Sequence, residues 1–172
     1  MLTVGDRFPC FNLKAVVSND PRTGIVEATN DAYKAGWLVV FFWPKDFSAV
    51  CPTEIEAFGR LEPTFRERGA QILGCSTDSE MVHLDLRNQK LPLNRLPYPM
   101  LSDVNHVLCD ALGIFDAQAG LAKRATYLVD PLGKIRFAMM TDWRVGRNPE
   151  EVLRVLDALQ TDKPCPCNWK NG

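Results

Sequence analysis

Hydrophobic residues along the chain follow two patterns, and these predict alternating strands and helices. Residues 37–43, Trp-Leu-Val-Val-Phe-Phe-Trp, form an unbroken apolar run rich in β-branched and aromatic side chains. A short run of this kind is typical of a strand that is buried on both faces. Residues 70–76, Ala-Gln-Ile-Leu-Gly-Cys-Ser, predict a second buried strand.

A helix is predicted between these two strands. After Cys51, apolar residues recur at helical spacing: Ile55, Phe58, Leu61 and Phe65. Pro52 suits the first helical turn, where its missing N–H is not needed, and Gly69 suits the end of the helix. Pro63 conflicts with this helix, because a proline in a helix interior should kink or interrupt it.

The rest of the chain predicts further helices and one hairpin. Residues 79–90 and 103–112 have helical patterns, and residues 149–160 carry an amphipathic stripe. Residues 125–130 and 134–141 are rich in strand-forming residues and flank the turn sequence Asp-Pro-Leu-Gly. These two segments therefore predict an antiparallel hairpin.

Strands that alternate with helices predict a parallel sheet, and the final hairpin adds antiparallel strands. Residues 1–36 contribute short strands and turns, so the whole order predicts an α/β fold with a central mixed β-sheet flanked by helices. We expect one domain over residues 1–160, followed by a polar tail over 161–172 that holds two cysteines.

The composition is that of an ordinary globular protein, and it narrows the range of partners. The chain has 172 residues, of which 46% are hydrophobic and 24% charged, and its net charge is −1. This balance offers no basic excess for binding nucleic acid or an anionic membrane. The longest strongly apolar run, residues 37–43, is far shorter than the roughly 20 residues of a membrane-spanning helix. No signal peptide is visible, so a cytoplasmic location is expected.

Six cysteines are dispersed along the chain, which is long enough to fold without disulfides. Cys51 stands apart from the others because it follows a strand and a loop and begins a helix. The unpaired N–H groups and the positive dipole end of a helix N-terminus stabilise a thiolate, which is the reactive form. Position alone leaves two interpretations open: a reactive thiol, or a small apolar residue at a packed helix end.

The residues around Cys51 resemble the active-site motif of the peroxiredoxins. Residues 44–54 read Pro-Lys-Asp-Phe-Ser-Ala-Val-Cys-Pro-Thr-Glu, and Pro44, Ser48 and Cys51 fall on the family pattern. The Cys-Pro-Thr-Glu segment is similar to the typical two-cysteine branch, which contains the C subunit of alkyl hydroperoxide reductase. Further segments also resemble the family, so the resemblance extends over nearly the whole chain: 73–78, 123–126, 129–131, 145–147 and 165–169. The resemblance implies a thioredoxin-like fold and a thiol peroxidase that reduces hydrogen peroxide and organic hydroperoxides.

The resemblance also implies a role for each motif residue. Cys51 is the expected nucleophile, and Arg124 is expected to stabilise its thiolate and to hold the peroxide oxygens. Ser48 is expected to hydrogen bond at the peroxide, and Pro44 to shield the thiolate from water. The expected supporting residues, which would orient an arginine side chain, are Glu54 and Arg147.

Attack on a peroxide leaves a sulfenic acid on Cys51, and a second thiol must resolve it. Cys165, followed by Pro166 and Trp169, matches the family's resolving segment and is the first choice, while Cys167 is expected to act instead or to pass the disulfide onward. In the family the resolving tail belongs to a neighbouring subunit, which implies a homodimer, often assembled into a decameric or dodecameric ring. The expected reductant is a thiol protein: a D-type alkyl hydroperoxide reductase partner linked to lipoamide, an F-type flavoprotein or thioredoxin.

No cofactor and no metal are expected. The chain has no Gly-rich loop that opens a helix after a strand. Its two histidines, His83 and His106, are isolated and lack ligand spacing, so both are predicted to be structural. The family segment around His83 usually continues to a Trp where this chain has Leu86, so the outer wall of the pocket is not predicted.

Three other functions compete with the peroxidase. A thioredoxin-type oxidoreductase needs a second cysteine three residues after Cys51, and position 54 is Glu. A cysteine hydrolase would need His83 or His106 as its base, and no hydrolase signature accompanies either. A redox-regulated chaperone or peroxide-sensing assembly, in which oxidation of Cys51 changes the oligomer, is compatible with the same residues.

Overall fold

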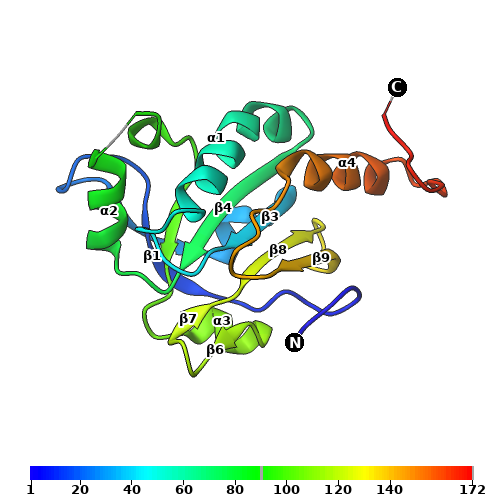
Figure 1. The fold of residues 1–172 in the computed structure, drawn as a ribbon. Helices are drawn as coiled ribbons and strands as arrows, with labels where there is room; N and C mark the ends of the chain where they lie inside the picture. The colour runs from blue at the N-terminus through cyan, green and yellow to red at the C-terminus, as the bar shows by residue number, and fades with distance from the viewer. Residues whose placement is uncertain (90, 172) are drawn as a thin grey trace.

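A seven-stranded mixed sheet forms the centre of the protein, and the computed structural model describes it over residues 1–89 and 91–171 (Figure 1). Its strands are β1 (Asn12–Val16), β2 (Ile25–Thr29), β3 (Trp37–Phe42), β4 (Ala70–Ser76), β5 (Met100–Ser102), β8 (Arg124–Val129) and β9 (Ile135–Thr141). They are ordered β2-β1-β5-β4-β3-β8-β9, with parallel pairing between β3, β4 and β5 and antiparallel pairing at both sides. A separate two-stranded ribbon consists of β6 (Phe115–Asp116) and β7 (Leu121–Ala122).

Helices cover both faces of this sheet. In the described residues the α-helices are α1 (Cys51–Glu67), α2 (Glu80–Gln89), α3 (Val107–Leu112) and α4 (Pro149–Gln160). Two short 3-10 helices, η1 (Asn30–Tyr33) and η2 (Leu93–Arg95), lie in the connections. Figure 1 shows α1 and α4 on one side of the sheet and α3 on the other. Within this part of the chain, none of the helices combines the length and the apolar character needed to cross a membrane.

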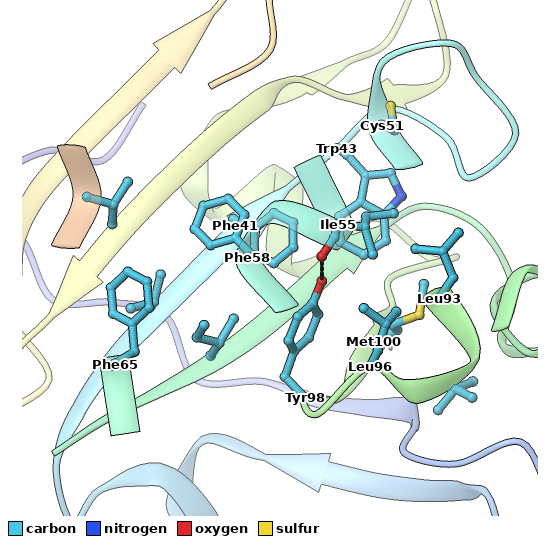
Figure 2. Close-up of a cluster of buried hydrophobic side chains, with 14 of the residues drawn as sticks. Phe41, Trp43, Cys51, Ile55, Phe58, Phe65, Leu93, Leu96, Tyr98 and Met100 are labelled. Atoms are coloured by element: carbon cyan, nitrogen blue, oxygen red, sulfur yellow. Dashed lines mark hydrogen bonds between the residues drawn. The ribbon is translucent and has the colours of Figure 1, made fainter. Parts of the chain in front are cut away.

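Strand β3 is buried on both faces, as its continuous apolar sequence predicts. Val39 and Phe41 pack into the cluster under α1, whereas Val40 and Phe42 pack into the cluster on the α3 side. Within the first cluster the ring of Phe41 stacks on that of Phe58, with centroids 4.0 Å apart (Figure 2). Burial of each such side chain stabilises the fold by roughly 1.5–3 kcal/mol, so β3 holds the two layers together.

Helix α1 runs without a break through Pro63, so the interruption expected there is wrong. The helix buries the same face before and after the proline: Phe58 precedes Pro63, Phe65 follows it, and both side chains lie in the cluster under α1. This burial outweighs the one backbone hydrogen bond that a proline removes from a helix interior. Local propensity therefore yields to packing against the sheet.

The helix predicted over residues 103–112 is shorter in the structure, because its first part is a capping turn. The buried carboxylate of Asp103 accepts hydrogen bonds from the N–H groups of Leu108 at 3.2 Å and Cys109 at 2.8 Å. His106, immediately before the helix, has a left-handed backbone with a φ of 60°. A residue in that conformation cannot continue a right-handed helix toward the N-terminus.

The other predicted elements are present, and a few short strands are additional. Helix α2 corresponds to the prediction over 79–90, although residue 90 lies outside the described residues. Strands β8 and β9 form the predicted hairpin. The sequence pattern missed β5, β6 and β7, because strands of two or three residues are too short for a hydrophobic period to show.

Candidate active site

Cys51 lies where strand β3 connects to helix α1. The strand ends at Phe42, a loop follows, and Cys51 is the first residue of the helix. Its backbone N–H donates to Ser48 Oγ at 3.0 Å, and the residue is fully buried. The thiol therefore lies at the positive end of the helix dipole and at one end of the hydrophobic cluster under α1 (Figure 2).

Strand pairing brings Arg124 to this thiol. Strand β8 is antiparallel to β3 and places Thr126 opposite Phe41, so the start of β8 lies beside the end of β3. Arg124 is the first residue of β8, and its Nη1 and Nη2 atoms both lie 3.6 Å from Cys51 Sγ. Because the guanidinium is only 2% exposed, water screens its attraction for a thiolate weakly.

Glu54, one helical turn after Cys51, holds two arginines. Its Oε2 atom accepts hydrogen bonds from Arg124 Nη1 and, at 2.9 Å, from Arg147 Nη2. Its Oε1 atom accepts from Nε and the backbone N–H of Arg147, at 2.8 and 2.7 Å. Burial raises the pKa of Glu54, but the hydrogen bonds and charge of Arg147, together with the charge of Arg124, hold that pKa below its usual range. The carboxylate is therefore ionised at neutral pH.

The buried side chains around Cys51 carry one positive charge in excess. Arg124, Arg147 and Glu54 are all buried, and together they carry two positive charges and one negative charge. An unpaired charge in a protein interior costs several kcal/mol. The excess charge lies beside Cys51, because Arg124 is the residue of the cluster whose guanidinium reaches Sγ.

Arg147, in the loop before α4, hydrogen bonds to both helix α1 and strand β8. Besides Glu54, its guanidinium donates to Thr126 Oγ1 at 3.1 Å and to the backbone oxygen of Ala125. It also lies over the ring of Phe41, 5.5 Å from the ring centroid. Burial lowers the pKa of Arg147, and its hydrogen bonds to Glu54 oppose this shift. These contacts orient Glu54 and, through it, Arg124.

A pocket of about 310 Å³ lies over Cys51. Three segments line it, namely the loop after β3, the approach to β8 and the loop before α4, through Pro44, Lys45, Ser48, Ala49, Val50, Cys51, Leu121, Arg124, Trp143 and Arg144. Pro44 is buried and Ser48 is half-buried in its wall. Four of the predicted site residues thus line one pocket, and Glu54 and Arg147 support it from behind.

Comparison with known proteins decides the family. The chain matches the AhpC/TSA family over residues 4–138. The chain belongs to this family. It is similar to "Alkyl hydroperoxide reductase C" of Mycolicibacterium smegmatis, with 48% identity over 180 residues that cover 100% of this chain and 92% of the relative. It is also 38% identical to "Thioredoxin peroxidase" of Echinococcus granulosus over 176 residues, which cover 98% and 89% of the two chains.

Solved structures of AhpC/TSA-family proteins share the fold. Mycobacterium tuberculosis AhpC superposes with a TM-score of 0.90 at 47% identity, and the match covers 99% of each chain. The reduced 2-Cys peroxiredoxin of Plasmodium vivax superposes with a TM-score of 0.92 at 28% identity, covering 100% of this chain and 91% of the other. The protein is thus a peroxiredoxin with the thioredoxin-like fold of that family, an enzyme for thiol-dependent peroxide reduction, as the motif around Cys51 predicts.

Sequence reasoning missed Asp46, which anchors the loop before the peroxiredoxin thiol. Asp46 is fully buried, accepts from Trp43 Nε1 at 2.8 Å, and lies 2.7 Å from His83 Nδ1. The other ring nitrogen of His83, Nε2, lies 3.0 Å from the backbone oxygen of Leu101. Both ring nitrogens of His83 therefore lie within hydrogen-bond distance of an oxygen, and the ring joins Asp46 to strand β5. A charged residue in a polar loop carries no sign of such burial in the sequence.

Neither histidine is placed to act as a base on Cys51, so the hydrolase interpretation loses its support. His83 is held by Asp46 and Leu101, and His106 stacks on Phe115 with ring centroids 4.0 Å apart. Across the two described ranges, no cluster of three or more His, Cys, Asp or Glu side chains is arranged to hold a metal ion. That the peroxiredoxin works without metal or cofactor stays a prediction.

The tail cysteines lie apart from the pocket of this peroxiredoxin. Cys165 is half-buried against the end of α4, with Sγ 3.7 Å from the backbone oxygen of Ala158, and Cys167 is exposed. Both line a second pocket beside Arg154, and that pocket shares no residue with the one at Cys51. All six cysteines are free thiols in this structure.

Leu86, where the family usually has Trp, lies beside the active-site loop. It is 3% exposed and lines an apolar pocket with Phe47 and Leu93. This pocket also includes Ser48 and Ala49, which belong to the pocket at Cys51 as well. An apolar pocket lined by Leu86 therefore adjoins the pocket at Cys51.

Proposed function

We propose that the chain reduces hydrogen peroxide and organic hydroperoxides with Cys51 as its nucleophile. The observation that carries this proposal is the placement of Arg124, with two nitrogens each 3.6 Å from Cys51 Sγ, at the base of a pocket. A guanidinium there stabilises both the attacking thiolate and the negative charge that develops on the leaving oxygen.

The first step oxidises the sulfur of Cys51. Its thiolate attacks the terminal oxygen of the hydroperoxide, an S–O bond forms and the O–O bond breaks. The leaving oxygen takes up a proton and departs as an alcohol, or as water when the substrate is hydrogen peroxide. Cys51 is left as a sulfenic acid, two electrons more oxidised than the thiol.

The surrounding residues prepare this step. Ser48 accepts from the Cys51 N–H and presents its hydroxyl to the pocket, where it can donate to a peroxide oxygen. Pro44 covers the sulfur against water, since it is itself buried in the pocket wall. Glu54 and Arg147 keep the Arg124 guanidinium directed at the sulfur.

The second step joins Cys51 to a tail cysteine. A thiol displaces the sulfenic hydroxyl as water, and a disulfide forms. We infer a homodimer in which the tail over residues 161–172 of one subunit serves the other, with Cys165 as the resolving thiol and Cys167 as its substitute or as a relay. Cys51 is fully buried, so the loop before α1 must open for this contact.

The disulfide then passes its oxidation to an external reductant. A thiol protein is proposed: a D-type partner linked to lipoamide, an F-type flavoprotein or thioredoxin. A decameric or dodecameric ring of the dimers is proposed as the assembly. A cytoplasmic location is proposed as well, because a cycle that depends on reduction by protein thiols suits a reducing compartment.

One experiment on the reduced protein tests this mechanism. One equivalent of peroxide is added, free thiols are blocked, and the products are separated on a non-reducing gel and mapped as peptides. Wild type is compared with Cys51→Ser, Cys165→Ser and Cys167→Ser, and Cys10→Ser serves as the control because Cys10 is exposed but lies outside the pocket.

We expect a covalent dimer within seconds that needs Cys51 and maps to Cys165, and Cys10→Ser should form it as wild type does. A dimer that maps to Cys167 would reassign the resolving thiol. Oxidation of Cys51 without a dimer would overturn resolution between subunits. Absence of preferential oxidation at Cys51 would overturn the proposed function.

A further inference from the structure

The pocket at Cys51 is much larger than a small peroxide requires. Its volume is about 310 Å³, whereas a water molecule occupies roughly 30 Å³ in the liquid. Hydrogen peroxide has only two heavy atoms, so it fills a small part of the pocket beside Cys51 and Arg124. The remaining space is therefore available to the body of a larger substrate.

The walls of this space combine apolar surface with positive charge. Leu121, Val50 and the indole of Trp143, which is 38% exposed, provide apolar surface beside the sulfur. Lys45 and Arg144 add two cations, and none of the residues that line the pocket is acidic. A surface of this kind suits a molecule with an apolar body and an anionic group.

The positive charges of Lys45 and Arg144 are available to a substrate. Arg124 shares its charge with Glu54, but within the described residues neither Lys45 nor Arg144 forms an ion pair. The Asp142 carboxylate, two residues before Arg144, accepts a hydrogen bond from the Arg144 backbone N–H at 3.1 Å and forms no ion pair with the Arg144 side chain.

The segment that carries Trp143 and Arg144 is fixed relative to the sulfur. Arg124 Nη2 donates to the backbone oxygen of Trp143 at 2.9 Å, so one guanidinium contacts both this segment and Cys51. The segment also closes on itself, because the Val145 N–H donates to the Asp142 backbone oxygen at 3.0 Å. The backbone of this segment is thus held beside the pocket that Trp143 and Arg144 line.

We propose that Trp143, Arg144 and Lys45 make this pocket selective for amphiphilic hydroperoxides that carry a carboxylate, such as a hydroperoxy fatty acid. The inference rests on the proposed peroxidase function of Cys51. The hydroperoxide group reaches Cys51, the apolar chain lies against Trp143 and Leu121, and the carboxylate lies near Arg144 and Lys45. The chemistry is unchanged: an S–O bond forms, the O–O bond breaks, and a hydroxy acid leaves with the proton.

The test compares a carboxylate-bearing alkyl hydroperoxide with its methyl ester, below the concentration at which either aggregates. The two have the same apolar body and the same peroxide, so the ratio of their kcat/KM values isolates the charge. Two exposed charge contacts predict a ratio of about five in favour of the acid at low salt, which falls toward about one near 1 M salt. Hydrogen peroxide is the third substrate.

Charge variants then locate the effect. In Lys45→Gln/Arg144→Gln the acid-to-ester ratio should fall to about one, mainly through KM of the acid. Arg22→Gln removes an exposed arginine that does not line the pocket, and it should leave the ratio as in wild type. Trp143→Ser should lower kcat/KM for acid and ester by a similar factor, relative to hydrogen peroxide.

The outcomes separate the selectivity from the peroxidase function. A ratio of about one in wild type, or an unchanged ratio in the double variant, would overturn the selectivity while turnover of hydrogen peroxide through Cys51 persists. The selectivity would also be overturned if the double variant formed the disulfide more slowly but kept the acid-to-ester ratio of wild type. In that case Lys45 and Arg144 would serve to dock the tail. Loss of all Cys51-dependent turnover in wild type would instead overturn the proposed function.

Discussion

At the scale of single residues, the site is organised by charge. Glu54 accepts from both Arg124 and Arg147 inside the protein, and this trio is one negative charge short of neutrality. The shortage falls beside Cys51 Sγ, because Arg124 is the member that reaches it. A buried charge needs a partner, and the thiolate that we propose for Cys51 is that partner.

Replacement of Arg124 should remove this preference. In Arg124→Gln the charges of Arg147 and Glu54 cancel, so the cluster has no excess positive charge to stabilise the proposed thiolate or the leaving oxygen. We expect kcat/KM for hydrogen peroxide to fall about 100-fold or more, measured by peroxide consumption. Arg136→Gln, on the solvent-exposed part of β9, should change it less than about two-fold. Equal losses in the two variants would contradict the assignment.

Glu54 should make the stability of the fold depend on pH. Its pKa in the folded protein is lowered, so its contribution is present above the usual carboxyl range and is lost as pH falls through the lowered pKa. We expect the free energy of unfolding of Glu54→Gln, measured in urea, to be about 3 kcal/mol lower than that of wild type at pH 7. This difference in free energy should become smaller as the pH is lowered.

A neighbouring carboxylate provides the control for this measurement. Glu56 lies on the same helix and forms an exposed i,i+4 pair with Arg60 at 2.7 Å. Glu56→Gln should change the free energy of unfolding by about 0.5 kcal/mol or less. A gap for Glu54→Gln that stays constant from pH 7 to pH 3 would argue against an ionised carboxylate in the cluster.

At the scale of elements, the site depends on how the loop after β3 is tied to its surroundings. Trp43 reaches across β4 and fits only because residue 74 is glycine, where a Cβ would lie 2.6 Å from the indole. The indole donates to Asp46, and Asp46 pairs with His83 on α2. Strand β4 and helix α2 therefore position the loop that leads to Cys51.

Loss of His83 should loosen this loop. In His83→Asn the buried Asp46 side chain loses its hydrogen-bond partner on α2, and we expect the free energy of unfolding to fall by about 2 kcal/mol, measured in urea. Amide hydrogen exchange should become faster in the loop over residues 43–50, and the rates in the strands of the sheet should change less. His106→Asn is the matched control, because Asn tolerates the left-handed backbone there and should cost about 0.5 kcal/mol. A similar loss of unfolding free energy in both variants would contradict a specific role of His83 in holding the loop.

At the scale of the whole molecule, the sheet separates its cysteines into accessible and inaccessible groups. Cys75 and Cys109 are fully buried on the α3 side, where burial raises the pKa of both thiols well above the ordinary value. Cys10 and Cys167 are exposed, and Cys165 is half-buried on the tail. The fold thus leaves the tail thiols free to exchange while it protects the core thiols.

Native alkylation should reveal this separation. With iodoacetamide at pH 8, followed by mass spectrometry, Cys10 and Cys167 should be modified within minutes. Cys75 and Cys109 should stay unmodified until the chain is unfolded in guanidinium, because a buried thiol with a raised pKa supplies little thiolate. Modification of Cys75 at the rate of Cys10 would contradict the buried arrangement.

Much of the fold and part of the site could be predicted from sequence. The run over residues 37–43 and the helical spacing after Cys51 report backbone period and burial, which local side chains encode directly. The motif around Cys51 identified the peroxiredoxin family. The errors arose at Pro63 and in the short strands, where packing outweighs local preference or the segment is too brief to show a period.

The sequence by itself therefore determined the order of strands and helices, the start of a helix at a cysteine, and the family. Only the tertiary structure decided which distant residues meet that cysteine. Arg124 reaches Cys51 because β8 pairs antiparallel with β3, and Trp143 reaches the pocket because its backbone bonds to Arg124. Such contacts depend on strand register and on the balance of buried charges across the whole fold, and no local pattern of side chains records either one.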